Sequence, residues 1–187
     1  MWYVIQVFTG QEEKMKEICE YQIPGDVLEK CFIPYYEEMK KYLGEWHKEK
    51  KILFPGYLFV ITEQITALHT ELKKIQGFTR ILGDQTYLLP LTDGEVAFIQ
   101  RFGGEEHLVE MSQGVIENDE ITIIDGPLKG FEGCIKRIDR HKRKAEIQIE
   151  MFGQLVNTTV GIEIIKRTAV KMNEENEEHN DTINEQI

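Results

Sequence analysis

Cysteines are few in this chain, and long apolar runs are absent from it. Its 187 residues include three cysteines, Cys19, Cys31 and Cys134. Their number is odd, they show no CxxC spacing, and each lies in an apolar run, so we expect buried reduced thiols and neither a disulfide framework nor a zinc site. No stretch approaches the ~18 apolar residues of a membrane span. The N-terminus also lacks the basic segment of a signal peptide. The sequence therefore predicts a cytoplasmic protein without a membrane span.

Catalytic motifs are absent as well. The sequence contains no P-loop and no nucleophile elbow, and its histidines lack paired Cys/His spacing. They lie in polar segments: His47, His69, His107, His141 and His179. We therefore expect a protein that is not an enzyme and that holds no metal or cofactor.

Positive charge is scarce and unevenly distributed. The formal net charge is −11, and residues 169–187 contain one basic and six acidic residues. A repulsive overall field disfavours indiscriminate coating of nucleic acid, so any such binding must come from a local basic surface. The acidic tail at 169–187 has too little apolar content to form a core, and we expect it to be disordered.

The most apolar segment of the first half is 54–61, Phe-Pro-Gly-Tyr-Leu-Phe-Val-Ile. Pro55 and Gly56 exclude a helix and predict a tight turn, and the β-branched and aromatic residues that follow predict a central strand covered on both faces. Further strands are expected at 2–8, 29–36 and 78–82. Helices are expected at 11–22 and 65–75, and a third begins at a Thr92 to Glu95 capping box.

Two basic segments stand out in this acidic chain. Residues 39–51 predict a protruding hairpin with lysines on either side of Tyr42 and Trp46, and the turn near 139–144 is also rich in Arg and Lys. Basic side chains beside aromatic rings can hold phosphates and stack bases, although a solvated hairpin or turn is an equally open interpretation. The candidate nucleic-acid residues are Trp46, Lys48, Lys50 and Lys51 in the hairpin, and Arg140, Lys142 and Arg143 in the turn.

The second half changes to short strands with a period of two. We expect a linker at 103–115 and a small barrel at 116–168, because strands near 120–124, 133–138, 144–149 and 156–160 are separated by turn residues. With the mixed first half at 1–102, this pattern predicts the α+β class.

Two groups of motifs resemble one known family in the same order. The segments 2–12, 54–60, 77–79 and 90–91 resemble the N-terminal (NGN) domain of the NusG transcription elongation factors. The segments 124–133 and 151–153 resemble the KOW domain of the same family. The resemblance implies an NGN domain, a mixed or antiparallel sheet flanked by helices, linked to an all-β KOW barrel.

The resemblance also implies partners. In the family, an apolar face of the NGN domain docks on the clamp helices of the largest RNA polymerase subunit and suppresses pausing. Phe54 and Tyr57 match the aromatic docking positions, and Pro55 and Gly56 shape the turn that presents them. In the KOW domain, Phe131 and Phe152 match positions that recruit a small-subunit ribosomal protein or the terminator Rho; the alternative is that these two rings are barrel core.

Two features favour a specialised paralogue of the LoaP or RfaH type, which recruits through a nucleic-acid hairpin in a leader. His69 and Thr70 resemble the start of the His-Thr-Thr loop of RfaH, although Glu71 replaces the second threonine. The second feature is the basic hairpin at 39–51, and residues 77–83 also resemble LoaP. The expected function is therefore processive transcription at specific operons by a monomeric factor. The alternatives are a housekeeping NusG, or a KOW-type RNA- or ribosome-binding protein with an unrelated N-terminal domain.

Overall fold

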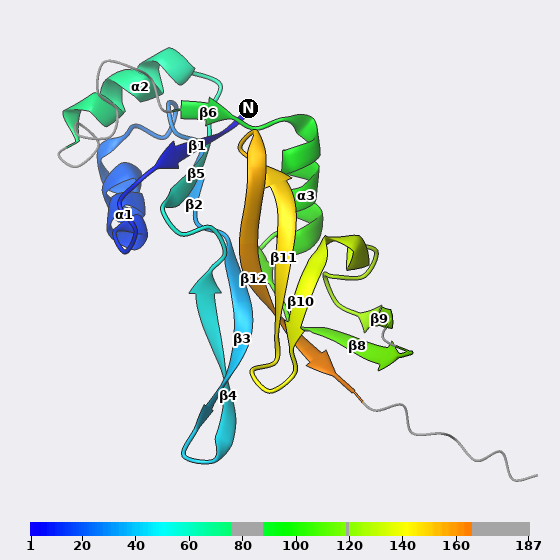
Figure 1. Ribbon diagram of the computed structural model, residues 1–187. Helices are drawn as coiled ribbons and strands as arrows, with labels where there is room; N and C mark the ends of the chain where they lie inside the picture. The colour runs from blue at the N-terminus through cyan, green and yellow to red at the C-terminus, as the bar shows by residue number, and fades with distance from the viewer. Residues whose placement is uncertain (76–87, 119, 166–187) are drawn as a thin grey trace, which may run out of the picture.

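An antiparallel four-stranded sheet forms the centre of the N-terminal part in this computed structural model, which describes residues 1–75, 88–118 and 120–165 (Figure 1). The strand order is β2-β5-β1-β6. The central pair is β5 (Tyr57–Ile61) and β1 (Trp2–Gln6), with β2 (Lys30–Phe32) and β6 (Leu88–Pro90) at the edges. The strand predicted at 78–82 lies outside the described residues.

Both faces of β5 are covered, as the sequence predicts. Because side chains alternate along a strand, Leu58 and Val60 point to one face and Phe59 to the other. Leu58 and Val60 pack in one apolar cluster with helices α1 (Glu12–Gln22) and α2 (Ile65–Lys74). Phe59 belongs to a second cluster, which includes residues from the C-terminal part.

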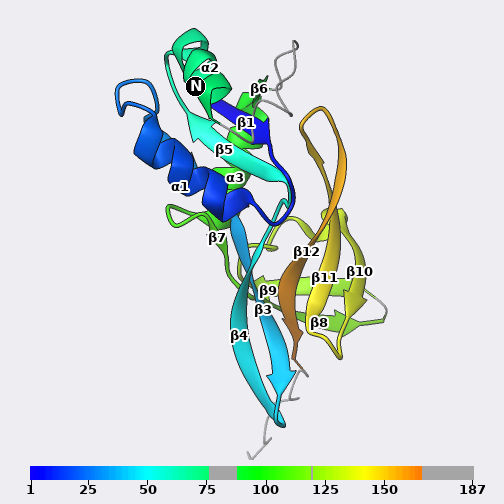
Figure 2. The same cartoon turned by 90° about the vertical axis from the view of Figure 1, so that its left-hand side faces the viewer.

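Below this sheet, a long hairpin extends away from the body of the protein (Figures 1 and 2). It consists of β3 (Tyr35–Tyr42) and β4 (Glu45–Ile52), and a short strand β7 (Leu108–Val109) pairs in parallel with the base of β3. The two-residue turn at Leu43 and Gly44 has φ values of 50° and 89°. Such a turn matches the twist of paired strands, so the predicted hairpin is confirmed.

Helix α3 (Asp93–Gly103) begins with the capping box that the sequence predicts. The Thr92 hydroxyl accepts a hydrogen bond from the Glu95 backbone N–H at 3.3 Å, and the Glu95 carboxylate accepts one from the Thr92 N–H at 2.7 Å. Two of the free N–H groups at the helix start are thereby satisfied. The helix packs between the N-terminal sheet and the C-terminal part (Figure 1).

The C-terminal part is a five-stranded sheet in the order β10-β11-β12-β8-β9. Its strands are β8 (Ser112–Glu117), β9 (Glu120–Asp125), β10 (Ile135–Asp139), β11 (Lys144–Met151) and β12 (Gln154–Ile164), with a short 3₁₀ turn at Glu132–Cys134. Together with the three helices described above, these strands confirm the α+β class.

The segment interpreted as a linker, 103–115, contains β7 and the beginning of β8. Its glycines and charges offer few side chains to a core, but its backbone pairs with β3 and β12, which a side-chain pattern does not reveal. The domain boundaries at 102 and 116 stay predictions. The tail at 169–187 lies outside the described residues.

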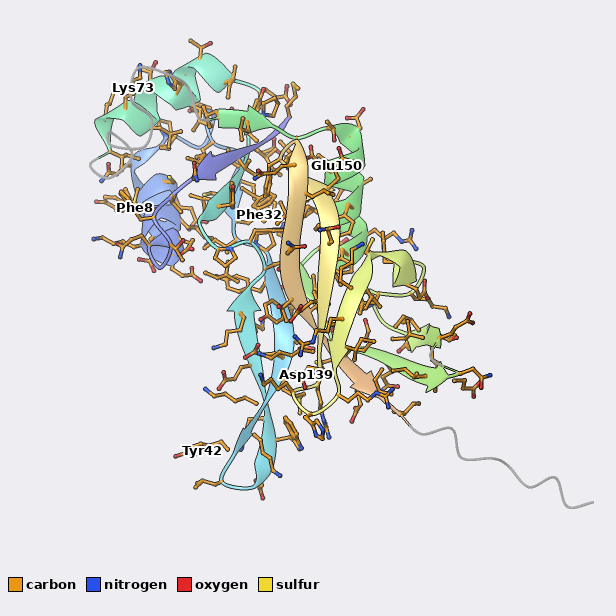
Figure 3. All side chains as sticks on the ribbon, in the orientation of Figure 1. Phe8, Phe32, Tyr42, Lys73, Asp139 and Glu150 are labelled. Atoms are coloured by element: carbon orange, nitrogen blue, oxygen red, sulfur yellow. The ribbon has the colours of Figure 1, made fainter. Side chains whose placement is uncertain are left out.

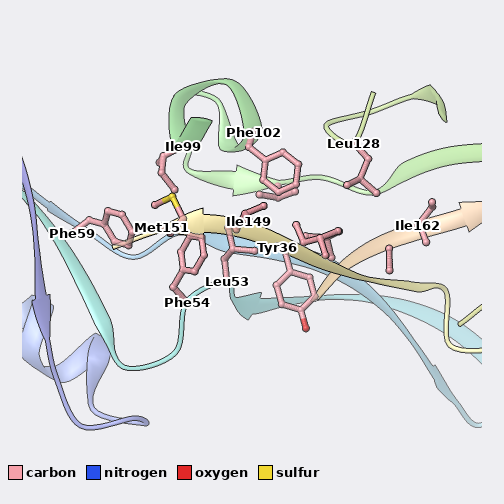
Figure 4. Packing of buried hydrophobic residues seen from close by; sticks show 14 of the residues in the cluster. Tyr36, Leu53, Phe54, Phe59, Ile99, Phe102, Leu128, Ile149, Met151 and Ile162 are labelled. Atoms are coloured by element: carbon pink, nitrogen blue, oxygen red, sulfur yellow. The ribbon is translucent and has the colours of Figure 1, made fainter. Parts of the chain in front are cut away.

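One apolar core joins the two parts. The second cluster combines Phe54, Phe59 and Phe102 of the N-terminal part with Ile149, Met151 and other residues of the C-terminal part (Figure 4). The KOW-like part thus packs directly on the second face of the N-terminal sheet.

Candidate functional site

The turn before β5 is held by a buried carboxylate. Gly56 has a φ of +84°, and a Cβ added there would lie 3.2 Å from Thr9 Oγ1, so glycine is the residue that fits. The Glu12 carboxylate, 1% exposed, accepts hydrogen bonds from the Gly56 N–H and the Gly10 N–H, both at 2.7 Å. From the sequence, Glu12 is only an acid at a helix start; nothing in the pattern indicates that it fixes this turn.

The two aromatic residues that flank this turn, Phe54 and Tyr57, contact Phe152 of the C-terminal part. The rings of Tyr57 and Phe152 stack with centroids 4.4 Å apart, and Phe54 meets Phe152 edge to face at 5.6 Å. Phe152 also lies 6.0 Å from Phe59. These distances are typical of favourable aromatic pairs. The predicted docking residues and one predicted KOW partner residue therefore cover each other.

In this arrangement, neither docking candidate is a freely exposed ring. Phe54 is 2% exposed, and Tyr57 is half-buried. Pro55 is exposed at the turn, and Gly56 is buried. The sequence predicts the aromatic face itself but not its cover, because the pairing of two distant segments leaves no local pattern.

The second KOW candidate, Phe131, contacts helix α3. Its ring lies edge to face with Phe98 at 5.4 Å and with Phe102 at 5.6 Å. The Arg101 guanidinium lies 4.6 Å from the centre of the same ring, a cation–π contact. Phe131 and Phe152 thus both lie at the contact between the two parts.

Polar contacts also join the two parts at the base of the hairpin. The Lys144 ammonium lies 2.6 Å from the buried Glu38 carboxylate, which also accepts a hydrogen bond from the Tyr36 hydroxyl at 3.0 Å. Burial, with the neighbouring Glu38 charge, raises the pKa of Tyr36 above its ordinary value. The Thr158 hydroxyl donates to the Leu53 carbonyl oxygen at 2.6 Å. The sequence pattern gives no sign of this ion pair, because it joins two segments far apart in the chain.

Close backbone approach accompanies these contacts. A Cβ added at Gly161 of β12 would lie 2.3 Å from the Glu37 carbonyl oxygen of β3, far inside van der Waals contact. Only glycine lets β12 lie this close to β3.

His69 and Thr70 lie on α2, in the helical layer that covers the first face of the sheet. The Thr70 hydroxyl donates to the Thr66 carbonyl within the same helix, at 3.0 Å. Tyr57 packs with the cluster on the opposite face of the sheet. The structure therefore separates this pair from the aromatic face.

The nucleic-acid candidates fall into two groups. The Arg143 guanidinium lies 4.4 Å from the centre of the Trp46 ring, so the structure brings the hairpin and the KOW turn together. Lys48 pairs with Glu37 at 3.0 Å, and Lys51 pairs with Glu49 at 3.2 Å.

The remaining candidates lie on the surface. Lys142 forms an exposed pair with Asp139 at 3.7 Å. Lys50 and Arg140 are exposed, with no ion pair among the described residues. These two cations are therefore available to phosphate groups.

Cys19 and Cys31 are buried, and Cys134 is half-buried, all with free thiols. The contact with Cys19 and burial raise the pKa of Cys31, which keeps this thiol protonated. Within residues 1–75, 88–118 and 120–165, no three His, Cys, Asp or Glu side chains gather as a metal site would require. The same residues contain no helix of the length and apolarity needed to cross a membrane.

Comparisons with known proteins agree with this architecture. Residues 1–100 match the family model described as "Transcription termination factor nusG". The transcription termination/antitermination protein NusG of Bacillus subtilis is 29% identical over 161 residues, which cover 82% of this chain and 90% of the relative. The protein of the same name from Halalkalibacterium halodurans is 30% identical over 162 residues, with the same coverage of 82% and 90%.

A solved structure described as "Domain interaction in Thermotoga maritima NusG" superposes with a TM-score of 0.55 at 25% identity, covering 87% of this chain and 93% of that chain. The match at 1–100 also argues against the alternative of an N-terminal domain unrelated to this family. Both the N-terminal match and the near full-length relatives lead to one assignment: the chain belongs to the NusG family, whose members are transcription factors and not enzymes.

Proposed function

We propose that this protein is a transcription elongation and antitermination factor that binds RNA polymerase through the face around Phe54 and Tyr57, with the clamp helices of the largest subunit as its partner. The observation that carries the proposal is the stack of Phe152 on Tyr57, with Phe54 and Phe59 beside it. The aromatic face that packs against Phe152 can make the same apolar contacts with a helix of a partner protein.

The two occupants compete for one face. Phe152 covers Tyr57, so polymerase can dock only after the KOW domain (116–168) has moved away from the NGN domain (1–102). Binding then depends on how often the two domains separate, since the affinity of a ligand falls with the population of the competent state.

Capture of purified core RNA polymerase by the full-length protein tests the docking face. We expect Tyr57→Ala to weaken capture by about 2 kcal/mol, roughly 25-fold in Kd, as truncation of a central interface aromatic does. Tyr21→Ala is the matched control, because Tyr21 is 90% exposed on α1, away from this face. Equal capture by both variants would remove Tyr57 from the docking surface.

We also propose that the factor acts at specific operons, in the cytoplasm with the transcribing polymerase. A covered docking face supports this proposal, because a factor that must first open is recruited only where something opens it. Transcript mapping in a strain that lacks the protein tests it. Loss of distal reads in one or a few operons is the expected result; a global change would instead indicate a housekeeping NusG, as the names of the relatives suggest.

For the KOW domain we propose that opening exposes its own partner surface at Phe131 and Phe152, which a small-subunit ribosomal protein or Rho would contact. Both rings lie against the NGN domain in the closed arrangement. Capture of either purified protein should therefore increase when polymerase is added. Capture that polymerase leaves unchanged would place the partner surface elsewhere.

A further inference from the structure

The outer half of the hairpin and the β10–β11 turn form the two sides of one open groove. Its volume is about 490 Å³. One wall belongs to the NGN domain and the other to the KOW domain, and the two meet where Arg143 lies over Trp46. The side chains that matter for its chemistry are Lys40, Lys41 and Trp46 on the first wall, and His141, Lys142 and Lys144 on the second.

The charge of this groove is opposite to that of the protein. Four lysines line it against one carboxylate, Glu38, which already pairs with Lys144. Lys40 and Lys142 form only exposed pairs, with Glu49 at 3.5 Å and Asp139 at 3.7 Å, and such pairs are weak. Lys41 is exposed and has no ion pair within the described part of the chain. Ammonium groups are therefore available here to an anionic ligand.

We infer that this groove is a binding site for single-stranded nucleic acid that is complete only when the two domains are packed together. Lysines on both walls can contact successive phosphates. The half-buried indole of Trp46, with the Arg143 guanidinium over it, adds an aromatic group to the lining. Its volume lies in the range of small-molecule sites and suits one or two nucleotides of a strand.

A strand that contacts both walls binds the closed arrangement more tightly than the open one. It therefore shifts the population toward the closed state, because a ligand stabilises the state that it binds better. If polymerase docks on the covered face, as the proposed function requires, each ligand lowers the affinity for the other. By linkage, the factor is the same in both directions. The binding site itself does not depend on that function.

The test measures binding of a fluorescein-labelled twelve-uridine RNA to the full-length protein. The wall variants are Lys41→Glu on the hairpin and Lys142→Glu on the turn. We expect each to weaken binding about tenfold at low salt and to reduce the salt slope by roughly 0.7 per lost phosphate contact. Lys73→Glu is the matched control, because Lys73 is exposed on α2, at the other end of the protein from the hairpin (Figure 3). This control should bind as the wild type does.

A second pair of variants separates a two-walled site from two independent basic patches. Gly161→Val moves β12 away from β3, and Phe152→Ala removes a ring at the far end of the domain contact; both keep every lysine of the groove. We expect both to weaken binding of the uridine strand at least fivefold while circular dichroism shows that the strands and helices are retained. Because the two substitutions lie at different points of the domain contact, a local folding defect in one variant would not explain weaker binding in both.

The outcomes separate clearly. Wild-type affinity in both wall variants, or in both opening variants, would overturn the inference. Tighter binding of a twelve-base-pair RNA duplex than of the single strand would overturn it as well. A twelve-thymidine DNA strand distinguishes the source: weaker binding than the uridine strand assigns the site to RNA, and equal binding assigns it to any single strand. None of these measurements contains polymerase. A negative result here therefore does not affect the docking proposal, and a negative result for polymerase docking does not affect this binding site.

Discussion

Single side chains fix the geometry of the aromatic face, and Glu12 has the largest part in it. Its buried carboxylate accepts hydrogen bonds from the N–H groups of both Gly10 and Gly56. It therefore links the turn after β1 to the turn before β5. A buried N–H group that loses its acceptor is no longer compensated for the water it gave up on folding, so the folded state is destabilised by the full desolvation free energy. The position of the Pro55 to Gly56 turn therefore depends on a side chain that is distant in sequence.

Glu12→Ala should lower the free energy of unfolding by about 2 to 4 kcal/mol, because two N–H groups lose their acceptor. Urea unfolding measures the effect. Glu17→Ala, an exposed change on the same helix, should stay within about 0.5 kcal/mol of the wild type. If the two variants were equally stable, the carboxylate would not hold the turn.

His107 is a second residue whose surroundings determine a measurable property, the pKa of its ring. Its ring stacks on Phe32 at 3.7 Å and lies 6.1 Å from Trp2, and both ring nitrogens are buried without a hydrogen-bond partner. Burial, helped by nearby Lys30 and opposed by Glu106, lowers the pKa of His107 from 6.5 to about 4.

The lowered pKa of His107 predicts a pH dependence of stability. Between pH 6.5 and about 4, the unfolded chain binds a proton on His107 that the folded protein does not bind, so the free energy of unfolding should fall as the pH falls through this range. Unfolding at a series of pH values measures the slope. His107→Asn, which suits the φ of 52° at this position, should lose that part of the slope, whereas exposed His47→Asn should keep it. Identical slopes in the wild type and His107→Asn would contradict the assignment.

Among the elements, the β3–β4 hairpin combines two different roles for its lysines. Lys48 neutralises Glu37, whose side chain is only 10% exposed and also accepts from the Met111 N–H at 3.2 Å. Lys50 is exposed, and Lys51 pairs only with the half-exposed Glu49. Lys48 therefore stabilises a nearly buried carboxylate of the hairpin. Lys50 and the weakly paired Lys51 are the two lysines that remain accessible to phosphate groups.

The double variant Lys50→Ala, Lys51→Ala should bind a leader hairpin more weakly than the wild type does, with the hairpin taken from an operon found by transcript mapping. Its melting temperature and polymerase capture should stay unchanged. Lys48→Ala should instead lower stability by roughly 1 to 3 kcal/mol, because a nearly buried carboxylate loses its partner. Gel-shift and thermal unfolding measurements on the same preparations distinguish the two effects. Unaltered leader binding in the double variant would exclude the β3–β4 hairpin from recruitment.

Local patterns explain how much of these elements could be predicted. The capping box at Thr92, the hairpin turn near Gly44 and the apolar run of β5 each depend on neighbours in sequence, and each lies where the sequence places it. The strand β8 was missed because Ser112 to Gly114 has no apolar alternation, although its partner β9 follows directly in the sequence; its second partner, β12, lies far along the chain. The candidate site divides in the same way, since the aromatic residues were predicted and their cover was not.

At the scale of the whole molecule, the arrangement of the two domains controls both surfaces. Phe152 on Tyr57, Lys144 on Glu38 and Gly161 against β3 act together at separate points along one contact. None of these pairs can be read from the sequence, because each joins segments that are some 90 residues or more apart. In this closed arrangement the aromatic face is covered and both walls of the basic groove are present. Our two proposals require that opening the domains uncovers the first and divides the second.

The most direct test of this account compares Phe152→Ala with Tyr57→Ala in binding of the full-length protein to core RNA polymerase. Both changes remove the same stacked pair, and Phe152→Ala also removes the contacts of that ring with Phe54 and Phe59. Only Tyr57 belongs to the proposed docking face, so the account predicts effects of opposite sign: Phe152→Ala should bind polymerase several-fold more tightly than the wild type, and Tyr57→Ala should bind it more weakly. Two variants that change affinity in the same direction would contradict it.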